Sequence, residues 1–204
     1  MFEAWVRWRI SYKADSIDPM KIRRLLRKEI MVLGGKTKDN CITLVVRPCF
    51  HDPNEQELET LIQYGIFIIE RTIRQIEKRG LAPRINCIYD RTNMTSANRD
   101  SGLIKFAMRM LTMLQDFYCE RLGNFFVINA NWAFWIAHKL VKPFLAKKTR
   151  DKMKLIYKME ELDAWIAPEE RFVFHGGTKE YSYDPCEDWD LQREEITSIE
   201  MSIS

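Results

Sequence analysis

Two short spacings in this chain suggest a catalytic role at first sight. Five residues separate Cys41 from Arg47, as in a cysteine phosphatase loop, and residues 34–37 (Gly-Gly-Lys-Thr) look like the end of a nucleotide-binding loop. A phosphatase loop needs backbone N–H groups curled around a phosphate and a thiolate near a helix N-terminus. The residues after Cys41 are mostly β-branched, which predicts a strand, and residues 34–37 lack a leading glycine and fit a turn. Neither spacing predicts catalysis.

The histidines and cysteines do not form a metal-ligand pattern. His51, His138 and His175 belong to different expected elements, and the five cysteines are irregularly spaced without a Cys-x2-Cys pair. We therefore predict no metal, no cofactor and no catalytic residue. A haem held by one histidine and a tyrosine is the redox alternative that this pattern leaves open. The absence of a secretory leader at residues 1–5 predicts a reducing, cytoplasmic location.

Residues 118–145 indicate a different kind of activity. Glu120 and Arg121 close a helix, a short apolar strand follows, and a second helix from about residue 132 to 145 is aromatic on almost every side. A helix that is apolar all round must be buried or face lipid. This one is too short to span a bilayer, which needs about 20 apolar residues. We therefore interpret it as a flap over an apolar site.

Basic residues follow the aromatic helix closely. Eight lysines and arginines lie between residues 139 and 158, against one aspartate. Lysines beside tryptophans suit the surface of an anionic bilayer, where each lysine adds about 1 kcal/mol. Nucleic acid could use the same residue types, but its aromatic contacts would be spread along a groove or sheet rather than one short helix. We therefore predict a peripheral membrane surface and no nucleic acid, with docking by Lys139, Lys142, Lys147 and Lys148.

Charge divides the 204 residues unevenly. The chain has a formal net charge of +3, but residues 180–204 carry −7, so the other 179 residues carry +10. A basic body favours an anionic partner. We expect residues 1–12 to be the remnant of an N-terminal helical segment, residues 13–180 to form one domain, and residues 181–204 to be an acidic disordered tail that could bind a protein partner.

These residues need an α/β fold to position them. We expect strands at 31–35, 41–46, 85–89, 125–128 and 153–157, and helices at 2–12, 18–29, 54–79, 99–118, 132–141 and 160–166. The first two strands flank a turn, which predicts a hairpin. The later strands alternate with helices, which predicts parallel crossovers and a mostly parallel β-sheet with helices on its faces.

Several motifs, in order, resemble the CRAL-TRIO family of lipid-binding and lipid-transfer domains. The similar segments are residues 87–94 (Cys-Ile-Tyr-Asp-Arg-Thr-Asn-Met), 118–123 (Tyr-Cys-Glu-Arg-Leu-Gly), 129–132 (Asn-Ala-Asn-Trp), 141–145 (Val-Lys-Pro-Phe-Leu) and 175–177 (His-Gly-Gly). The resemblance implies a hydrophobic lipid pocket between the sheet and the helices, closed by a gate helix. It also implies that the domain binds and exchanges a lipid without catalysing bond chemistry.

The resemblance assigns lipid-binding roles to particular side chains. Those of the gate are Trp132, Phe134, Trp135, Val141 and Phe144. Phe125 would lie towards the pocket, and Glu120, beside Arg121, falls on a glutamate that contacts inositol in binders of inositol lipids. A structural ion pair between Glu120 and Arg121 is the alternative.

Two departures leave the ligand open. Inositol-lipid binders of the family have a lysine where Phe174 stands, and the hydroxyl residues that serve phosphatidylcholine would align with Ile85 and Cys87. A lipid ligand is therefore expected, but its class is not. The alternative function is a membrane-tethering or adaptor module that transfers nothing.

Overall fold

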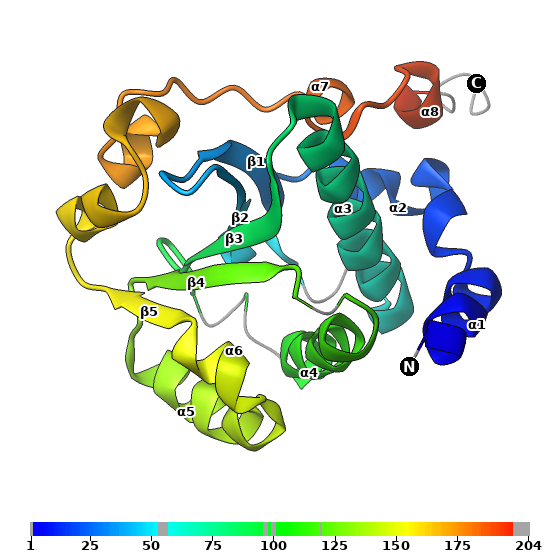
Figure 1. The fold of residues 1–204 in the computed structure, drawn as a ribbon, viewed down its shortest axis with the longest axis horizontal. Helices are drawn as coiled ribbons and strands as arrows, with labels where there is room; N and C mark the ends of the chain where they lie inside the picture. Colours follow the sequence, from blue (N-terminus) through cyan, green and yellow to red (C-terminus); the bar gives the residue numbers. More distant parts are fainter. Residues whose placement is uncertain (1, 53–56, 96–97, 99–100, 119, 198–204) are drawn as a thin grey trace.

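A five-stranded sheet forms the centre of the computed structural model, which describes residues 2–52, 57–95, 98, 101–118 and 120–197 (Figure 1). The strand order is β1 (Met31–Lys36), β2 (Cys41–Val46), β3 (Ala82–Asp90), β4 (Leu122–Ile128) and β5 (Met153–Ile156). β1 and β2 pair antiparallel, and the other three pairings are parallel. The hairpin and the mostly parallel α/β sheet expected from the sequence are confirmed.

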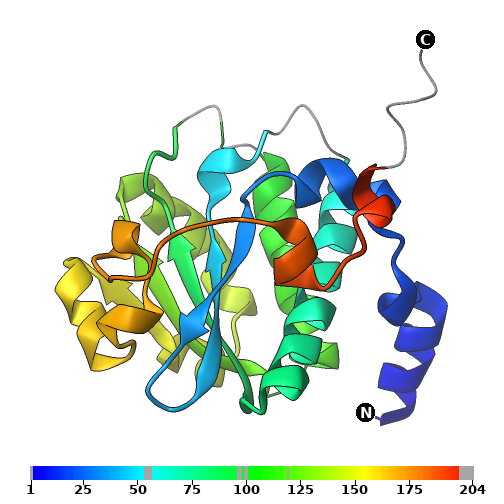
Figure 2. The same cartoon turned by 90° about the horizontal axis from the view of Figure 1, so that it is seen from above.

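The crossovers carry the helices to one face of the sheet. They contain α3 (Leu58–Arg79), α4 (Ser101–Phe117), and α5 (Trp132–Val141) with α6 (Lys147–Asp151). Each crossover joins neighbouring strands in the same direction, so a constant right-handed turn places these helices on the same side (Figures 1 and 2). The other α-helices in the described part of the chain are α1 (Phe2–Tyr12), α2 (Pro19–Leu26), α7 (Pro185–Trp189) and α8 (Glu194–Thr197).

The expected elements differ from the observed ones mainly at their ends. The expected helix starts at residues 54 and 99 lie outside the described residues, as does Cys119. The segment at 160–166 forms a 3-10 helix, η5 (Met159–Ala164), instead of an α-helix. The side chain of Glu161 accepts a hydrogen bond from Lys158 N at 3.0 Å, which caps this short turn.

Alternating side chains divide the sheet between two hydrophobic cores. Leu33, Leu44 and Ile85 pack with α2, α3 and α4 on one face. Val45 and Phe126, from the opposite side of the pleat, pack with the segment that follows β5. In Figure 2, residues 168–184 run across this second face. The helix-covered face of the sheet is thus shared among α2, α3 and α4.

Two glycines of the sequence motifs are required by close packing. A Cβ on Gly123 would lie 2.5 Å from Asn86 Oδ1, which accepts a hydrogen bond from Asn124 N. A Cβ on Gly177 would lie 2.0 Å from the carbonyl oxygen of Arg171. Both distances are shorter than any van der Waals contact, so these motif positions serve the fold.

The C-terminal segment, residues 181–197, is folded, contrary to the expectation of a disordered tail from residue 181. Trp189 is fully buried, and its Nε1 donates to Tyr183 Oη at 3.3 Å. Leu191 and Ile196 are also buried in the same core. Lys78 Nζ lies 3.2 Å from an Asp190 carboxylate oxygen, so α3 neutralises part of the acidic charge. Residues 198–204 lie outside the described part of the chain.

Candidate functional site

The predicted gate is the helix α5 together with the turn that follows it. Asn129, in a left-handed conformation with φ of 57°, ends β4, and Asn131 caps the helix by accepting a hydrogen bond from Phe134 N at 3.2 Å. α5 ends at Val141, and Pro143 then lies in a 3-10 turn, η4 (Lys142–Phe144). We call α5 the gate helix, and residues 132–145 the gate segment.

The gate segment exposes most of its large apolar side chains. Trp132 is 70% exposed and Phe144 55% exposed. Trp135, Ile136 and Leu140 are exposed as well. Within this segment Phe134 and Leu145 are buried, and Val141 is half-buried. Clustered exposed apolar side chains mark binding surfaces for proteins or membranes.

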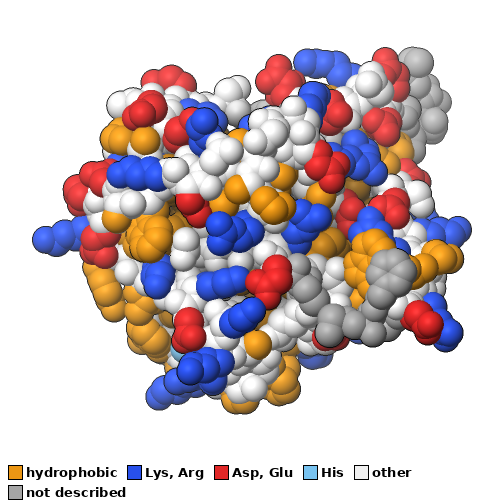
Figure 3. All heavy atoms as spheres, in the orientation of Figure 1, with side chains coloured by type: hydrophobic (Ala, Val, Ile, Leu, Met, Phe, Trp, Pro, Cys, Tyr) orange, Lys and Arg blue, Asp and Glu red, His pale blue; other side chains and the backbone are white. Residues whose placement is uncertain are grey.

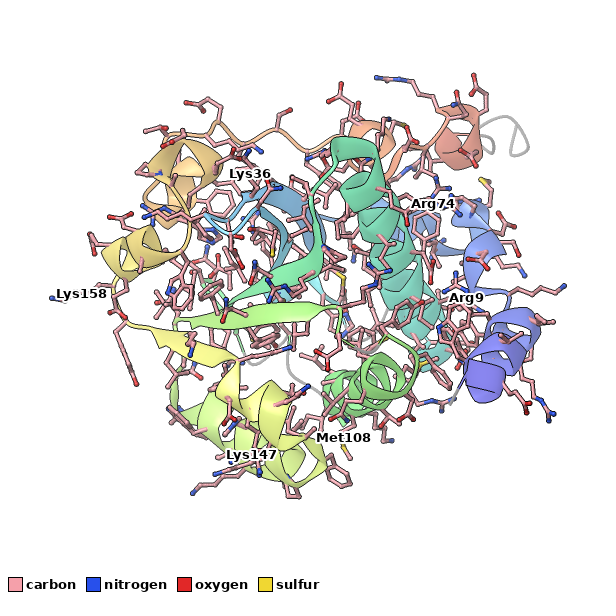
Figure 4. All side chains as sticks on the ribbon, viewed as in Figure 1. Arg9, Lys36, Arg74, Met108, Lys147 and Lys158 are labelled. Carbon is pink, nitrogen blue, oxygen red and sulfur yellow. The ribbon has the colours of Figure 1, made fainter. Side chains whose placement is uncertain are left out.

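The predicted docking lysines lie on and beside this apolar surface. Lys139, Lys142 and Lys147 are exposed. Figure 3 shows hydrophobic and basic side chains side by side along the lower edge of the molecule, and Figure 4 shows Lys147 in this region. Lys148 differs, because its Nζ lies 2.8 Å from Glu120 Oε1.

Beneath the gate helix, the sheet presents a partly exposed apolar surface. Phe125 of β4 and Tyr89 of β3 stack with ring centroids 6.0 Å apart, and both are half-buried. Burial raises the pKa of Tyr89 above its ordinary value. Met153 and Leu155 on β5 share this face and are half-buried too. Phe125 therefore lies on the helix-covered side, among apolar side chains that are incompletely covered.

Glu120 and Arg121 point to different surroundings. Glu120 has φ of 63° and pairs with Lys148, and the hydrogen bond from Lys148 lowers the pKa of Glu120. Arg121 instead donates to Pro83 O at 3.3 Å. The alternative of a Glu120–Arg121 ion pair is therefore wrong: the left-handed residue between α4 and β4 turns the two side chains apart.

Arg121 also lines an open cleft of about 720 Å³ between α1, α3 and the end of α4. Glu70 is buried at this cleft and accepts hydrogen bonds from Arg9 Nη1 at 2.9 Å and from Tyr118 Oη at 2.5 Å. Figure 4 shows Arg9 and Arg74 on this side, away from Lys147. Arg121 and the gate residues are thus parts of different surfaces.

Phe174 is part of an aromatic cluster around Arg47. The guanidinium carbon of Arg47 lies 4.8 Å from the Phe174 ring centroid and 4.5 Å from that of Phe50. Arg47 Nη1 also pairs with Glu29 at 3.0 Å. The position of the family's lysine is therefore occupied by a ring that covers another basic residue.

Cys41 and His175, which belong to the catalytic alternatives, are both buried. Burial raises the pKa of the Cys41 thiol, and nearby Asp39 raises it further, which disfavours the thiolate that a phosphatase needs. His175 is buried with its Nε2 3.0 Å from an Asp90 carboxylate oxygen. Burial alone would raise the pKa of Asp90, but hydrogen bonds from His175 and Thr92 hold it below its ordinary value.

Sequence reasoning missed two residues that hold the gate segment. Arg91 Nη2 donates to the capping Asn131 Oδ1 at 3.0 Å. At the other end, Gln115 Nε2 donates to Phe144 O at 3.2 Å, and Ala146 N donates to Gln115 Oε1 at 2.9 Å. The position of Arg91 next to Asp90, within the motif at residues 87–94, was a signal that could have identified it. A glutamine in an amphipathic helix carries no such signal.

Comparison with known proteins decides the family. The CRAL/TRIO domain matches residues 26–177. The chain belongs to the CRAL/TRIO domain family. It is 28% identical to a CRAL-TRIO domain-containing protein of Schizosaccharomyces pombe over 89% of this chain and 17% of that protein.

Other CRAL/TRIO relatives are also matched over only part of their own lengths. The phosphatidylinositol transfer protein CSR1 of Eremothecium gossypii is 25% identical over 84% of this chain and 38% of its own length. The Sec14 cytosolic factor of Schizosaccharomyces pombe is 48% identical over 50% of this chain and 36% of its own. The chain thus spans less than half of these relatives.

The fold has a counterpart among solved structures. The crystal structure of Sfh5 superposes with a TM-score of 0.61 at 15% identity, covering 77% of this chain and 57% of that one. The expected family and fold class are confirmed. None of the helices in the described ranges is long and apolar enough to cross a membrane.

Proposed function

We propose that this CRAL/TRIO domain binds a single hydrophobic ligand, a phospholipid or another lipid, and exchanges it with membranes by movement of the gate helix. The domain acts as a peripheral protein on the cytoplasmic side of membranes and catalyses no bond chemistry. The observation that carries the proposal is the gate segment, whose apolar side chains are exposed above a partly exposed apolar face of the sheet.

The proposal follows from the cost of moving a lipid through water. Each buried CH₂ group contributes about 0.8 kcal/mol, so a chain-bearing lipid leaves a bilayer slowly unless its chain stays covered. A helix that contacts the bilayer through Trp132, Trp135 and Phe144 could move into the lipid and uncover the face that holds Phe125. The ligand would then pass between two apolar environments.

The class of lipid follows less directly from the side chains. The names of two relatives concern phosphatidylinositol transfer and a cytosolic factor, which makes a phospholipid the first class to test. Phe174 covers Arg47, and exposed Glu120 is engaged by Lys148, so neither is arranged to bind an inositol headgroup. We therefore propose a ligand recognised mainly through its apolar part.

Two measurements test the proposal together. Native mass spectrometry of the purified protein should show one co-purified lipid, and fluorescent phospholipid should move between vesicles at a rate that increases with protein concentration. Absence of both results would reject lipid exchange.

A substitution of one exposed residue of the gate segment distinguishes lipid exchange from the adaptor function. Trp135→Glu places a charge on the membrane-facing surface, and we expect it to abolish vesicle binding and lipid exchange while leaving the fold intact. Binding of a protein partner by a non-transferring adaptor would survive this change. Unaltered exchange by Trp135→Glu would contradict the role of the gate.

A further inference from the structure

The N-terminal end of the gate helix is held by buried groups. Arg91 is 7% exposed, donates to Asn131 and lies over the Phe134 ring, 5.5 Å from its centroid. Phe134 is itself 7% exposed. A charge-assisted hydrogen bond away from water is stronger than one on the surface.

The loop that carries Arg91 is fixed on its other side as well. Neighbouring Asp90 contacts buried His175, and one of its oxygens accepts a hydrogen bond from Thr92 N at 2.9 Å. Asn129 Nδ2 donates to Thr92 Oγ1 at 2.6 Å, which ties this loop to the residues just before the gate helix. Movement at this end would therefore disturb both faces of the sheet.

The C-terminal end of the gate segment is held mainly by exposed groups. Gln115 makes hydrogen bonds with the backbone of Phe144 and Ala146 at the surface. The Lys148 and Glu120 side chains of the adjacent ion pair are 79% and 71% exposed. Leu145, 9% exposed, is the buried apolar contact here. Exposed ion pairs contribute little and are weakened by salt.

We infer that the gate opens from its C-terminal end, turning about residues 129–131, and that an anionic membrane promotes this step by taking Lys148 from Glu120. Phosphate or carboxylate groups of lipid headgroups offer Lys148 an equivalent partner at the surface. The same negative charge repels Glu120. Gln115 is then the positioning residue that keeps the C-terminal end of the gate segment closed when no membrane is bound. This inference rests on the proposed function, because it assumes that the gate segment meets a bilayer.

Amide hydrogen exchange of the whole chain measures which end opens. We expect the amides of Lys142, Leu145 and Ala146 to exchange faster than those of Phe134 and Trp135, and to accelerate further with vesicles of phosphatidylserine and phosphatidylcholine. Vesicles of phosphatidylcholine alone should have less effect. Faster exchange at Phe134 and Trp135 would overturn the inferred direction.

Gln115→Ala removes both surface hydrogen bonds and should open the C-terminal end without any membrane. One such bond contributes about 1 kcal/mol, so we expect exchange at Leu145 and Ala146 to rise at least about fivefold. Thr112→Ala, one turn earlier on α4 with its hydroxyl bonded to Met108 O, is the matched control and should change neither amide. Equal exchange in Gln115→Ala and the control would refute the role of Gln115.

Glu120→Gln tests the competition for Lys148. We expect this variant to open at a lower fraction of phosphatidylserine than the parent protein, since the ion pair no longer holds the end closed. An unchanged dependence on phosphatidylserine would reject the exchange of partners.

The hydrogen-exchange results are independent of lipid transfer. If the C-terminal end opens as expected but no lipid is exchanged, the proposed function fails and the inferred movement stands. If lipid is exchanged while the N-terminal end opens first, the proposed function stands and the inferred movement fails.

Discussion

In the gate segment and in the C-terminal segment, the burial of a tryptophan is the opposite of what the composition of each segment suggests. Residues 132–145 contain no acidic side chain, yet Trp132 is 70% exposed. Residues 181–197 are rich in acids, yet Trp189 is fully buried. In the C-terminal segment, three apolar side chains reach the core, and none of the acids is fully buried. In the gate segment, two side chains reach the interior and the other large ones do not.

The difference shows that the average character of a segment does not decide its place in the fold. Trp189, Leu191 and Ile196 pack in the same core as the buried side chains of α2 and α3, because α7 contacts α3 and α8 contacts α2. One acidic side chain, Asp190, then pairs with Lys78 of α3. The gate helix, by contrast, is part of the last crossover, lies at the edge of the molecule in Figure 1, and leaves Trp132, Ile136 and Leu140 exposed.

The largest expected effect is on stability, through the buried tryptophan. Trp189→Ala should lower the free energy of unfolding by about 3–5 kcal/mol, because it leaves a large cavity in a packed core. Urea denaturation followed by circular dichroism measures this. Trp132→Ala is the matched control, and it should change the stability by about 0.5 kcal/mol or less. Equal losses in the two variants would remove the contrast between the segments.

The second effect concerns membrane binding. It should be large for substitutions in the gate segment, whereas the loss of stability is large for the substitution in the C-terminal segment. The double variant Trp132→Ala/Phe144→Ala should reduce binding to anionic vesicles by about a hundredfold or more, since burial of each large apolar side chain contributes about 1.5–3 kcal/mol. Vesicle co-sedimentation measures this. Ile10→Ala, which alters a 72% exposed side chain on α1, should bind as the parent does. If both variants bind equally well, the gate segment is not the docking surface.

The smallest effect is a pH dependence of the C-terminal segment. Burial raises the pKa of Asp188 to about 6, although its carboxylate accepts a hydrogen bond from Leu33 N at 3.3 Å. The folded state thus holds this proton more tightly than the unfolded state, whose aspartates have a pKa near 3.9. Stability should therefore rise as the pH falls from 7 to 5, by up to about 1 kcal/mol.

Urea denaturation of Asp188→Asn at the two pH values isolates this group. The substitution removes the titrating carboxyl, so the difference between pH 7 and pH 5 should become smaller than in the parent protein. An identical pH dependence in both proteins would assign the effect to other groups. The gate segment contains no carboxylate, so the substitution should leave membrane binding unchanged.

Local patterns were sufficient for most of the fold. The mostly β-branched run of β2, the Asp18-Pro19 helix start and the order of strands and helices all led to the correct α/β sheet. Such patterns act between residues close in sequence, which is why they can be recognised without the structure. The 3-10 helix η5 was mistaken for an α-helix because a segment of so few turns does not show whether its apolar residues repeat every 3.0 or every 3.6 residues.

The candidate site was predicted less completely than the fold. The gate residues and lysines were chosen by type and by resemblance, and the structure places them along one segment. Arg91 and Gln115 were missed because they act on backbone and side chains 29 to 40 positions away. For Glu120 the sequence offered a lipid contact or, as the alternative, an ion pair with its neighbour Arg121, whereas its partner Lys148 lies 28 positions further on.

The sequence by itself determined the α/β elements, the family and a helix whose apolar side chains had to meet either a core or a lipid. Periodicity, caps and glycine positions express short-range physics and can be recognised from neighbouring residues alone. Only the tertiary structure decided that Trp132 faces outwards, that Trp189 is buried, and that Gln115 and Arg91 hold the two ends of the gate segment. Exposure and long-range contacts depend on which surfaces the completed fold leaves uncovered.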